Sequence, residues 1–175
     1  MNIAIISSAH PDVPDFIVPT LNKLIEQLKT MPNMKLLTGG SLGVPGQIVQ
    51  KANKAGIHTI AYSPDENIEN HHRRHDNLAL HHFNEVKHFC GFTMRSLAML
   101  QDADGVLALN GRMGTLSEFT IALEEGKRVA VLTNTGGVAD HLQNITGVIQ
   151  KDFSKNLFFS DDPKMVIQWL AENHD

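Results

Sequence analysis

Gly105-Val106-Leu107-Ala108-Leu109 is a continuous apolar run, typical of a strand that is buried on both faces of a parallel sheet. It continues directly into Asn110-Gly111-Arg112-Met113-Gly114-Thr115-Leu116-Ser117-Glu118, which predicts a glycine-containing turn and then a helix with a carboxylate in its first turn. Backbone N–H groups and the helix dipole favour an anion at such a turn. Residue types alone also allow a capping box, in which Thr115 caps the helix and Glu118 reaches back to its amide.

A second unit of the same kind lies earlier in the chain. The apolar run at residues 35–38 leads into Gly39-Gly40-Ser41-Leu42-Gly43-Val44-Pro45-Gly46. Two such units indicate a phosphorylated small molecule held between two loops, although the glycines of this one could simply serve a tight turn with positive φ angles. The loop has neither the G-x-G-x-x-G pattern nor the Lys-Ser/Thr pair of a Walker A motif, which disfavours NAD-dependent and ATP-hydrolysing activities.

Strands and helices are expected to alternate along the chain. Short apolar runs predict strands at residues 3–6, 35–38, 58–63, 105–109, 127–133 and 156–159. Between them, apolar residues recur at helical spacing, as in Leu21, Leu24, Ile25 and Leu28. Residues 65–90 are polar and irregular. The pattern predicts an α/β fold, a doubly wound and mostly parallel Rossmann-like sheet with helices on both faces, formed by residues 1–175 as one domain.

Composition limits the function classes. The net charge is −4 and only 6% of residues are aromatic, so nucleic acid is not an expected partner. No apolar run is long enough to span a bilayer, and Met1 leads straight into a strand without a signal-peptide pattern. The single cysteine, Cys90, excludes an internal disulfide and is expected to be buried and inert. We therefore expect a cytoplasmic protein.

Histidines are concentrated at residues 71–88, and His71 and His75 are one helical turn apart. The segment lacks the H-E-x-x-H pattern, and the chain has no cysteine cluster. We predict no metal site; a polar insertion near the pocket mouth or an oligomer contact is the expected role of this segment, within which Arg73 or Arg74 could contact phosphate.

The central hundred residues resemble the LONELY GUY family and its wider relatives, which include molybdenum cofactor carrier proteins. The family has a glycine-rich loop after its second strand, to which Gly39, Gly40, Gly43 and Gly46 correspond. It has an arginine four residues before a methionine, as at Arg95 and Met99, and then Pro-Gly-Gly-x-Gly-Thr-x-x-Glu, to which Gly111, Gly114, Thr115 and Glu118 correspond. Asn110 and Arg112 replace the Pro and the second Gly of that pattern.

The resemblance implies hydrolysis of the N-glycosidic bond of a nucleoside 5′-monophosphate, with Arg95 and Glu118 as catalytic residues and no required cofactor. The implied ligand-binding residues are those of the two loops: Gly39, Gly40, Ser41, Gly43, Gly111, Arg112, Met113, Gly114 and Thr115. Relatives form dimers or larger assemblies, so a homo-oligomer is expected, and the helix at residues 94–101 could supply its interface.

Departures from the family pattern favour an alternative. Arg112 places a large cation where a glycine lets the backbone approach the ligand, and Ser96 replaces a lysine that is usual in the enzymes. Thr135-Gly136-Gly137 is closer to the carrier branch. The alternative is a non-catalytic protein that binds a nucleotide or a phosphorylated pterin. A third hypothesis, single-stranded DNA binding as in related DNA-processing proteins, is disfavoured by the charge and the few aromatic residues.

Overall fold

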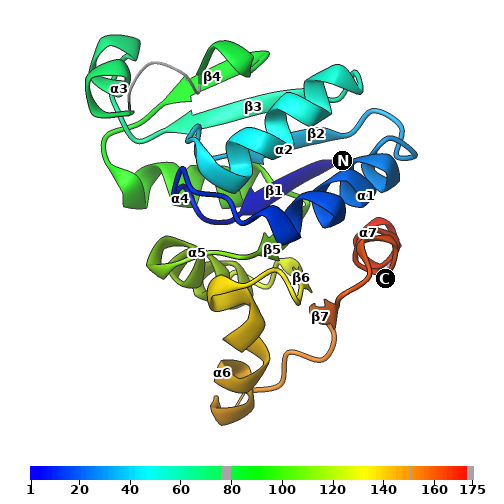
Figure 1. The fold of residues 1–175 in the computed structure, drawn as a ribbon. Coiled ribbons are helices and arrows are strands. Elements are labelled where there is room, and N and C mark those ends of the chain that lie inside the picture. The colour runs from blue at the N-terminus through cyan, green and yellow to red at the C-terminus, as the bar shows by residue number, and fades with distance from the viewer. Residues whose placement is uncertain (76–79, 150, 173–175) are drawn as a thin grey trace.

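A seven-stranded, entirely parallel sheet forms the centre of the molecule, in the order β4-β3-β2-β1-β5-β6-β7 (Figure 1). The computed structural model describes residues 1–75, 80–149 and 151–172. The strands are β1 (Asn2–Ile6), β2 (Lys35–Thr38), β3 (His58–Ser63), β4 (Glu85–His88), β5 (Gly105–Leu109), β6 (Arg128–Leu132) and β7 (Leu157–Ser160). This is the doubly wound α/β fold that the sequence predicts.

Strand β1 marks the point at which the winding of the sheet reverses. It pairs with β2 on one side, with Ile3 opposite Leu36, and with β5 on the other, with Ile5 opposite Leu107. Strands β2, β3 and β4 follow one another on one side of β1, and the chain then returns to add β5, β6 and β7 on its other side. Ligands in open α/β sheets bind beyond the carboxyl ends of the strands at such a reversal.

Helices cover both faces of the sheet. On one face lie α1 (Val18–Leu28), α2 (Gly43–Lys54) and α7 (Pro163–Ala171), whose apolar stripes join Ile3, Ile5 and Leu107 in one buried cluster. On the other lie α4 (Phe92–Asp102), α5 (Met113–Glu124) and α6 (Leu142–Val148), which pack with Ala4, Ile6 and Val106 in a second cluster. Consecutive strand residues point to opposite faces, so each strand contributes to both clusters.

The polar segment at residues 65–90 contributes to the sheet. It contains α3 (Ile68–His75), the 3₁₀ turn η2 (Leu80–His82) and the edge strand β4, which pairs with β3 so that Ala61 lies opposite Val86. Sequence patterns miss β4 because Glu85-Val86-Lys87-His88 lies at the sheet edge, is only partly buried and has a single aliphatic residue. A second 3₁₀ turn, η3 (Gly137–His141), leads into α6.

None of the helices within the described parts of the chain is long and apolar enough to cross a membrane.

Candidate functional site

A cavity of about 380 Å³ opens where the sheet reverses. Its wall comes from the end of β1 and the segment after it, from the turn after β2 and the start of α2, from the first turn of α4, and from the first two turns of α5. The lining residues are Ile5, Ser7, Ser8, Ala9, His10, Gly39, Ser41, Pro45, Phe92, Arg95, Arg112, Met113, Gly114, Thr115 and Glu118. The cavity is thus where the fold predicts a ligand site.

Both glycine-containing loops contribute to this one cavity. Gly39 and Ser41 line it from the turn after β2, and Arg112–Thr115 line it from the start of α5. Arg95 and Glu118 lie in the same wall. Gly40, Gly43 and Gly111 are not among the lining residues, although sequence reasoning assigned them to ligand binding.

All three glycines have positive φ and thereby shape the loops, and their part in ligand binding stays a prediction. A Cβ on Gly43 would lie 2.5 Å from the carbonyl oxygens of Ser8 and His10, so glycine lets the segment after β1 pack onto the start of α2. A Cβ on Gly111 would lie 2.6 Å from the Thr115 side chain. Substitution at either position would displace one wall of the cavity.

Glu118 is held by two donors that meet at a single oxygen. Arg95 Nη1 lies 2.7 Å and Ser96 Oγ 2.8 Å from Glu118 Oε1. Only 8% of the Glu118 side chain and 15% of the Arg95 side chain is exposed, so the charges of this ion pair are only weakly screened by water. The guanidinium packs against the glycine turn, where a Cβ on Gly39 would lie 2.7 Å from Arg95 Nη1.

The capping-box alternative is wrong. The residue that precedes α5 is Arg112, which makes no side-chain capping hydrogen bond, and Glu118 bonds to α4. The residue before α2, Leu42, makes none either, and neither helix has an acidic residue in its first turn. The Val44 amide in the first turn of α2 donates instead to the Ser8 carbonyl at 3.1 Å. The start of α5, which has no side-chain cap and lies beside the cavity, is the more favourable environment for an anion.

Three buried polar atoms of residues that line the cavity have no hydrogen-bond partner within the part of the chain that the structure describes: Ser7 Oγ, Arg95 Nε and Thr115 Oγ1. Thr115 is only 2% exposed. Buried polar groups are nearly always hydrogen-bonded, because an unsatisfied one costs about 1–3 kcal/mol. Their convergence on one cavity indicates a site for a polar ligand.

Sequence reasoning missed the segment Ser7–His10 and Phe92. The available signal for the first was topological: a ligand site at the reversal point must include the segment after the first strand. Phe92, the first residue of α4, lines the cavity with 53% of its surface exposed, and Arg95 Cζ lies 5.9 Å from its ring centroid. An exposed aromatic ring in the cavity wall offers a stacking surface for a planar ligand.

Asn110 and Thr135 support the turn after β5 from behind. The Asn110 amide donates to Thr135 Oγ1 at 2.7 Å, and Asn110 Nδ2 donates to the Thr135 carbonyl at 2.8 Å. Asn110 has a φ of 52°, which proline cannot adopt, so its replacement of the family's Pro has a backbone reason. Thr135–Gly137 thus helps to shape the turn and does not line the cavity.

The described residues of the histidine-rich segment do not line the cavity, but His71 packs beside the glycine turn after β2, where a Cβ on Gly40 would lie 3.7 Å from His71 Cε1. His71 is buried, with Nδ1 2.8 Å from Ser63 Oγ and 3.6 Å from Asp65 Oδ2. The side chains of Arg74 and His75 lie outside what the structure describes. Across the residues that the structure describes, no three His, Cys, Asp or Glu side chains are grouped as a metal would require. Cys90 is exposed, contrary to expectation, because it lies in the loop between β4 and α4.

Comparison with known proteins identifies the family. A family model described as the SLOG cluster4 family matches residues 2–166. No curated protein matches the chain.

Several solved structures share the fold. The X-ray structure of TM1055 is 21% identical, with a TM-score of 0.77 and coverage of 97% of both chains. The molybdenum cofactor carrier protein of Chlamydomonas reinhardtii is 21% identical, with a TM-score of 0.74 and 97% coverage of both chains. The DNA processing protein A of Streptococcus pneumoniae is 16% identical, with a TM-score of 0.69; 99% of this chain covers 62% of that one. At these identities the likeness shows the fold alone.

Proposed function

This chain belongs to the SLOG cluster4 family, and from the chemistry of its cavity we propose that it is a phosphoribohydrolase, which cleaves the N-glycosidic bond of a nucleoside 5′-monophosphate. The products are the free base and ribose 5-phosphate.

The arrangement of Glu118 carries the proposal. Arg95 and Ser96 both donate to Oε1, and no hydrogen bond to Oε2 is found within the described residues. The carboxylate is thus held in one orientation with its second oxygen available to the cavity that it lines. A fixed carboxylate is what glycosidic cleavage needs, because the sugar passes through an oxocarbenium-like state.

The rest of the cavity suits the two ends of such a substrate. The uncapped start of α5 and the unpartnered Thr115 hydroxyl suit the 5′-phosphate. The exposed face of Phe92 suits the base. Glu118 accepts a proton from water, whose oxygen bonds to C1′ as the C1′–N bond breaks. The departing base takes up that proton, so the reaction consumes one water and leaves the carboxylate unchanged.

The proposal is tested by incubating the protein with AMP and the other 5′-monophosphates and separating free base by chromatography. Glu118→Gln keeps the acceptor for Arg95 but cannot take a proton, so release should fall at least about a hundredfold. Glu124→Gln, an exposed change on the same helix, is the matched control. A folded protein that releases no base from any monophosphate would refute the proposal.

A second candidate, binding without turnover, is favoured by Arg112. This exposed arginine lines the cavity at the start of α5, where a second anionic group of a ligand could lie. The ligand would be a nucleotide or a phosphorylated pterin. For a binding protein, such a ligand should raise the melting temperature and be recovered unchanged. Arg112→Gly should then weaken binding, whereas in a hydrolase it should widen access and leave turnover intact or higher.

A further inference from the structure

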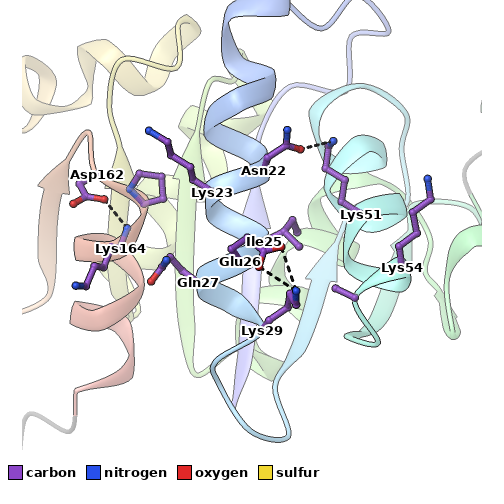
Figure 2. Close-up of a pocket in the computed structure, with 12 residues that line it drawn as sticks. Asn22, Lys23, Ile25, Glu26, Gln27, Lys29, Lys51, Lys54, Asp162 and Lys164 are labelled. Carbon is purple, nitrogen blue, oxygen red and sulfur yellow. Dashed lines mark hydrogen bonds and ion pairs between the residues drawn. The ribbon is translucent and has the colours of Figure 1, made fainter.

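A second cavity, of about 660 Å³, lies on the outer surface of α1, α2 and α7 and does not involve the glycine turns (Figure 2). We call it the lysine groove, after the five lysines that line it: Lys23, Lys29, Lys51, Lys54 and Lys164. Figure 2 shows α1 crossing the middle of the view, with α2 on one side and α7 on the other. The lysines come from all three helices.

The lysine groove concentrates positive charge on a protein whose net charge is negative. Five of the chain's 15 Lys and Arg residues line it, against two of its 19 acidic residues, although the net charge of the chain is −4. The carboxylates are Glu26, paired with Lys29 at 3.0 Å, and Asp162, which accepts from the Lys164 backbone amide at 2.9 Å. The groove is therefore a positive region on a negative molecule.

Helix stability explains only part of this arrangement. Lys51 and Lys54 lie in the last turn of α2, where a cation complements the helix dipole. Lys164, however, lies in the first turn of α7, where the dipole disfavours a cation, and Lys23 lies in the middle of α1. Neither ammonium group has a hydrogen bond or ion pair within the described residues. These two lysines are thus free to contact an anionic partner.

The surface between the lysines is only partly polar, with Asn22 and Gln27 as its uncharged polar residues. Ile25 is 5% exposed and Pro163 is buried, so apolar contact comes from the half-buried Ala55 and from the methylene stems of the lysine side chains beneath their charged ends. A partner must therefore combine negative charge with apolar contact.

We propose that the lysine groove binds an acidic, amphipathic segment of a partner protein. A helix that places apolar residues on one face and Asp or Glu beside them would match the apolar surface and its lysines. Nucleic acid fits less well. Among the described residues that line the groove, none is an aromatic residue that could stack on bases and none is an arginine that could offer a bidentate phosphate contact. Glu26 and Asp162 would also repel a continuous phosphate backbone.

The test uses a fluorescent helical peptide of about 20 residues, with leucine on one face and glutamate on the flanking positions. A twin peptide carries lysine in place of every glutamate. We expect saturable binding of the acidic peptide with a Kd below about 1 mM, weakening as salt is raised. No saturation, or equal binding of the twin, would overturn the proposal. Tighter binding of a single-stranded oligonucleotide of similar length would overturn the assignment to a polypeptide.

A matched pair of variants locates the site. Lys23→Glu/Lys164→Glu reverses the two free cations of the groove, and acidity in the first turn of α7 favours that helix. Lys151→Glu/Lys155→Glu makes the same change in net charge outside the groove. The groove variant should weaken peptide binding at least about tenfold and the control by less than about twofold, both with unchanged far-ultraviolet circular dichroism. Equal weakening by the two variants would mean that the peptide responds to net charge and not to the groove.

Discussion

Arg95 Nη1 lies 2.7 Å from Glu118 Oε1, and this buried ion pair joins the first turn of α4 to the second turn of α5 across the cavity wall. Removing one partner leaves the other charge uncompensated. We expect Arg95→Met to lower the free energy of unfolding by about 3 kcal/mol, and Arg95→Met/Glu118→Gln to recover part of that loss.

Urea denaturation measures the free energy of unfolding of Arg95→Met and of the double variant. Lys151→Met serves as control, since it breaks an exposed pair with Glu124 and should cost less than about 1 kcal/mol. If the double variant is as unstable as Arg95→Met alone, the charge of Glu118 is not what makes the single substitution costly.

Substitution of Gly114 should have opposite effects on stability and on ligand binding. A Cβ at this position meets no protein atom within 4 Å, yet the residue lines the cavity. Gly114→Ala should stabilise α5 by about 0.5–1 kcal/mol, because alanine loses less backbone entropy in a helix. The methyl group should also narrow the cavity, so AMP binding should weaken severalfold.

Gly147→Ala in α6 is the matched control, since a Cβ there also meets no atom within 4 Å. Both variants should melt at a higher temperature, and only Gly114→Ala should show weaker binding by calorimetry. Unchanged AMP binding in Gly114→Ala would argue against a ligand at the start of α5.

Phe92 is expected to select ligands with an aromatic ring. Phe92→Ala should weaken AMP binding about tenfold, because stacking of a base on an aromatic ring contributes about 1–3 kcal/mol. Binding of ribose 5-phosphate, which has no base, should be unchanged. Met94→Ala is the control: Met94 is 57% exposed on the same helix but does not line the cavity. Equal loss for both ligands would place the base elsewhere.

Tyr62 gives the protein a measurable alkaline transition. Burial and a hydrogen bond of 2.5 Å to Asp102 raise the pKa of Tyr62 from 10.0 to about 12. Lys87 donates to the same carboxylate at 2.8 Å, which raises the pKa of Lys87 to about 12. Both groups bind their protons more tightly in the folded chain. Their contribution to stability is thus fully present below pH 10 and lost as the pH rises to about 12.

Because Tyr62 is the only tyrosine, tyrosinate absorbance reports its titration directly. The midpoint should lie near 12 in the native protein and near 10 in denaturant. In Tyr62→Phe, the free energy of unfolding should fall less steeply as the pH rises from 10.0 to about 12. A native midpoint near 10 would contradict the hydrogen-bonded geometry of Tyr62.

The order of strands and helices was largely determined by the sequence, because apolar runs and helical spacing are local properties. Strands β2, β3 and β5 have the bounds expected from residues 35–38, 58–63 and 105–109. The edge strand β4 escaped prediction, since a partly exposed strand of four residues needs no apolar run. The same local patterns indicated both glycine turns, which supply part of the cavity lining; Arg95 and Glu118 were expected from the family resemblance, and Ser7–His10 and Phe92 were not expected.

Only the tertiary structure decided how those parts act together. The placement of β1 between β2 and β5 brings Ser7–His10 into the cavity and joins two turns that lie far apart in the chain. Glu118 could cap its own helix by sequence, but its contact with Arg95 and Ser96 exists only because α4 packs beside α5. The lysine groove likewise requires α1, α2 and α7 to share one face of the sheet. Local patterns specify which elements form, whereas the partners of a side chain depend on how the sheet is wound.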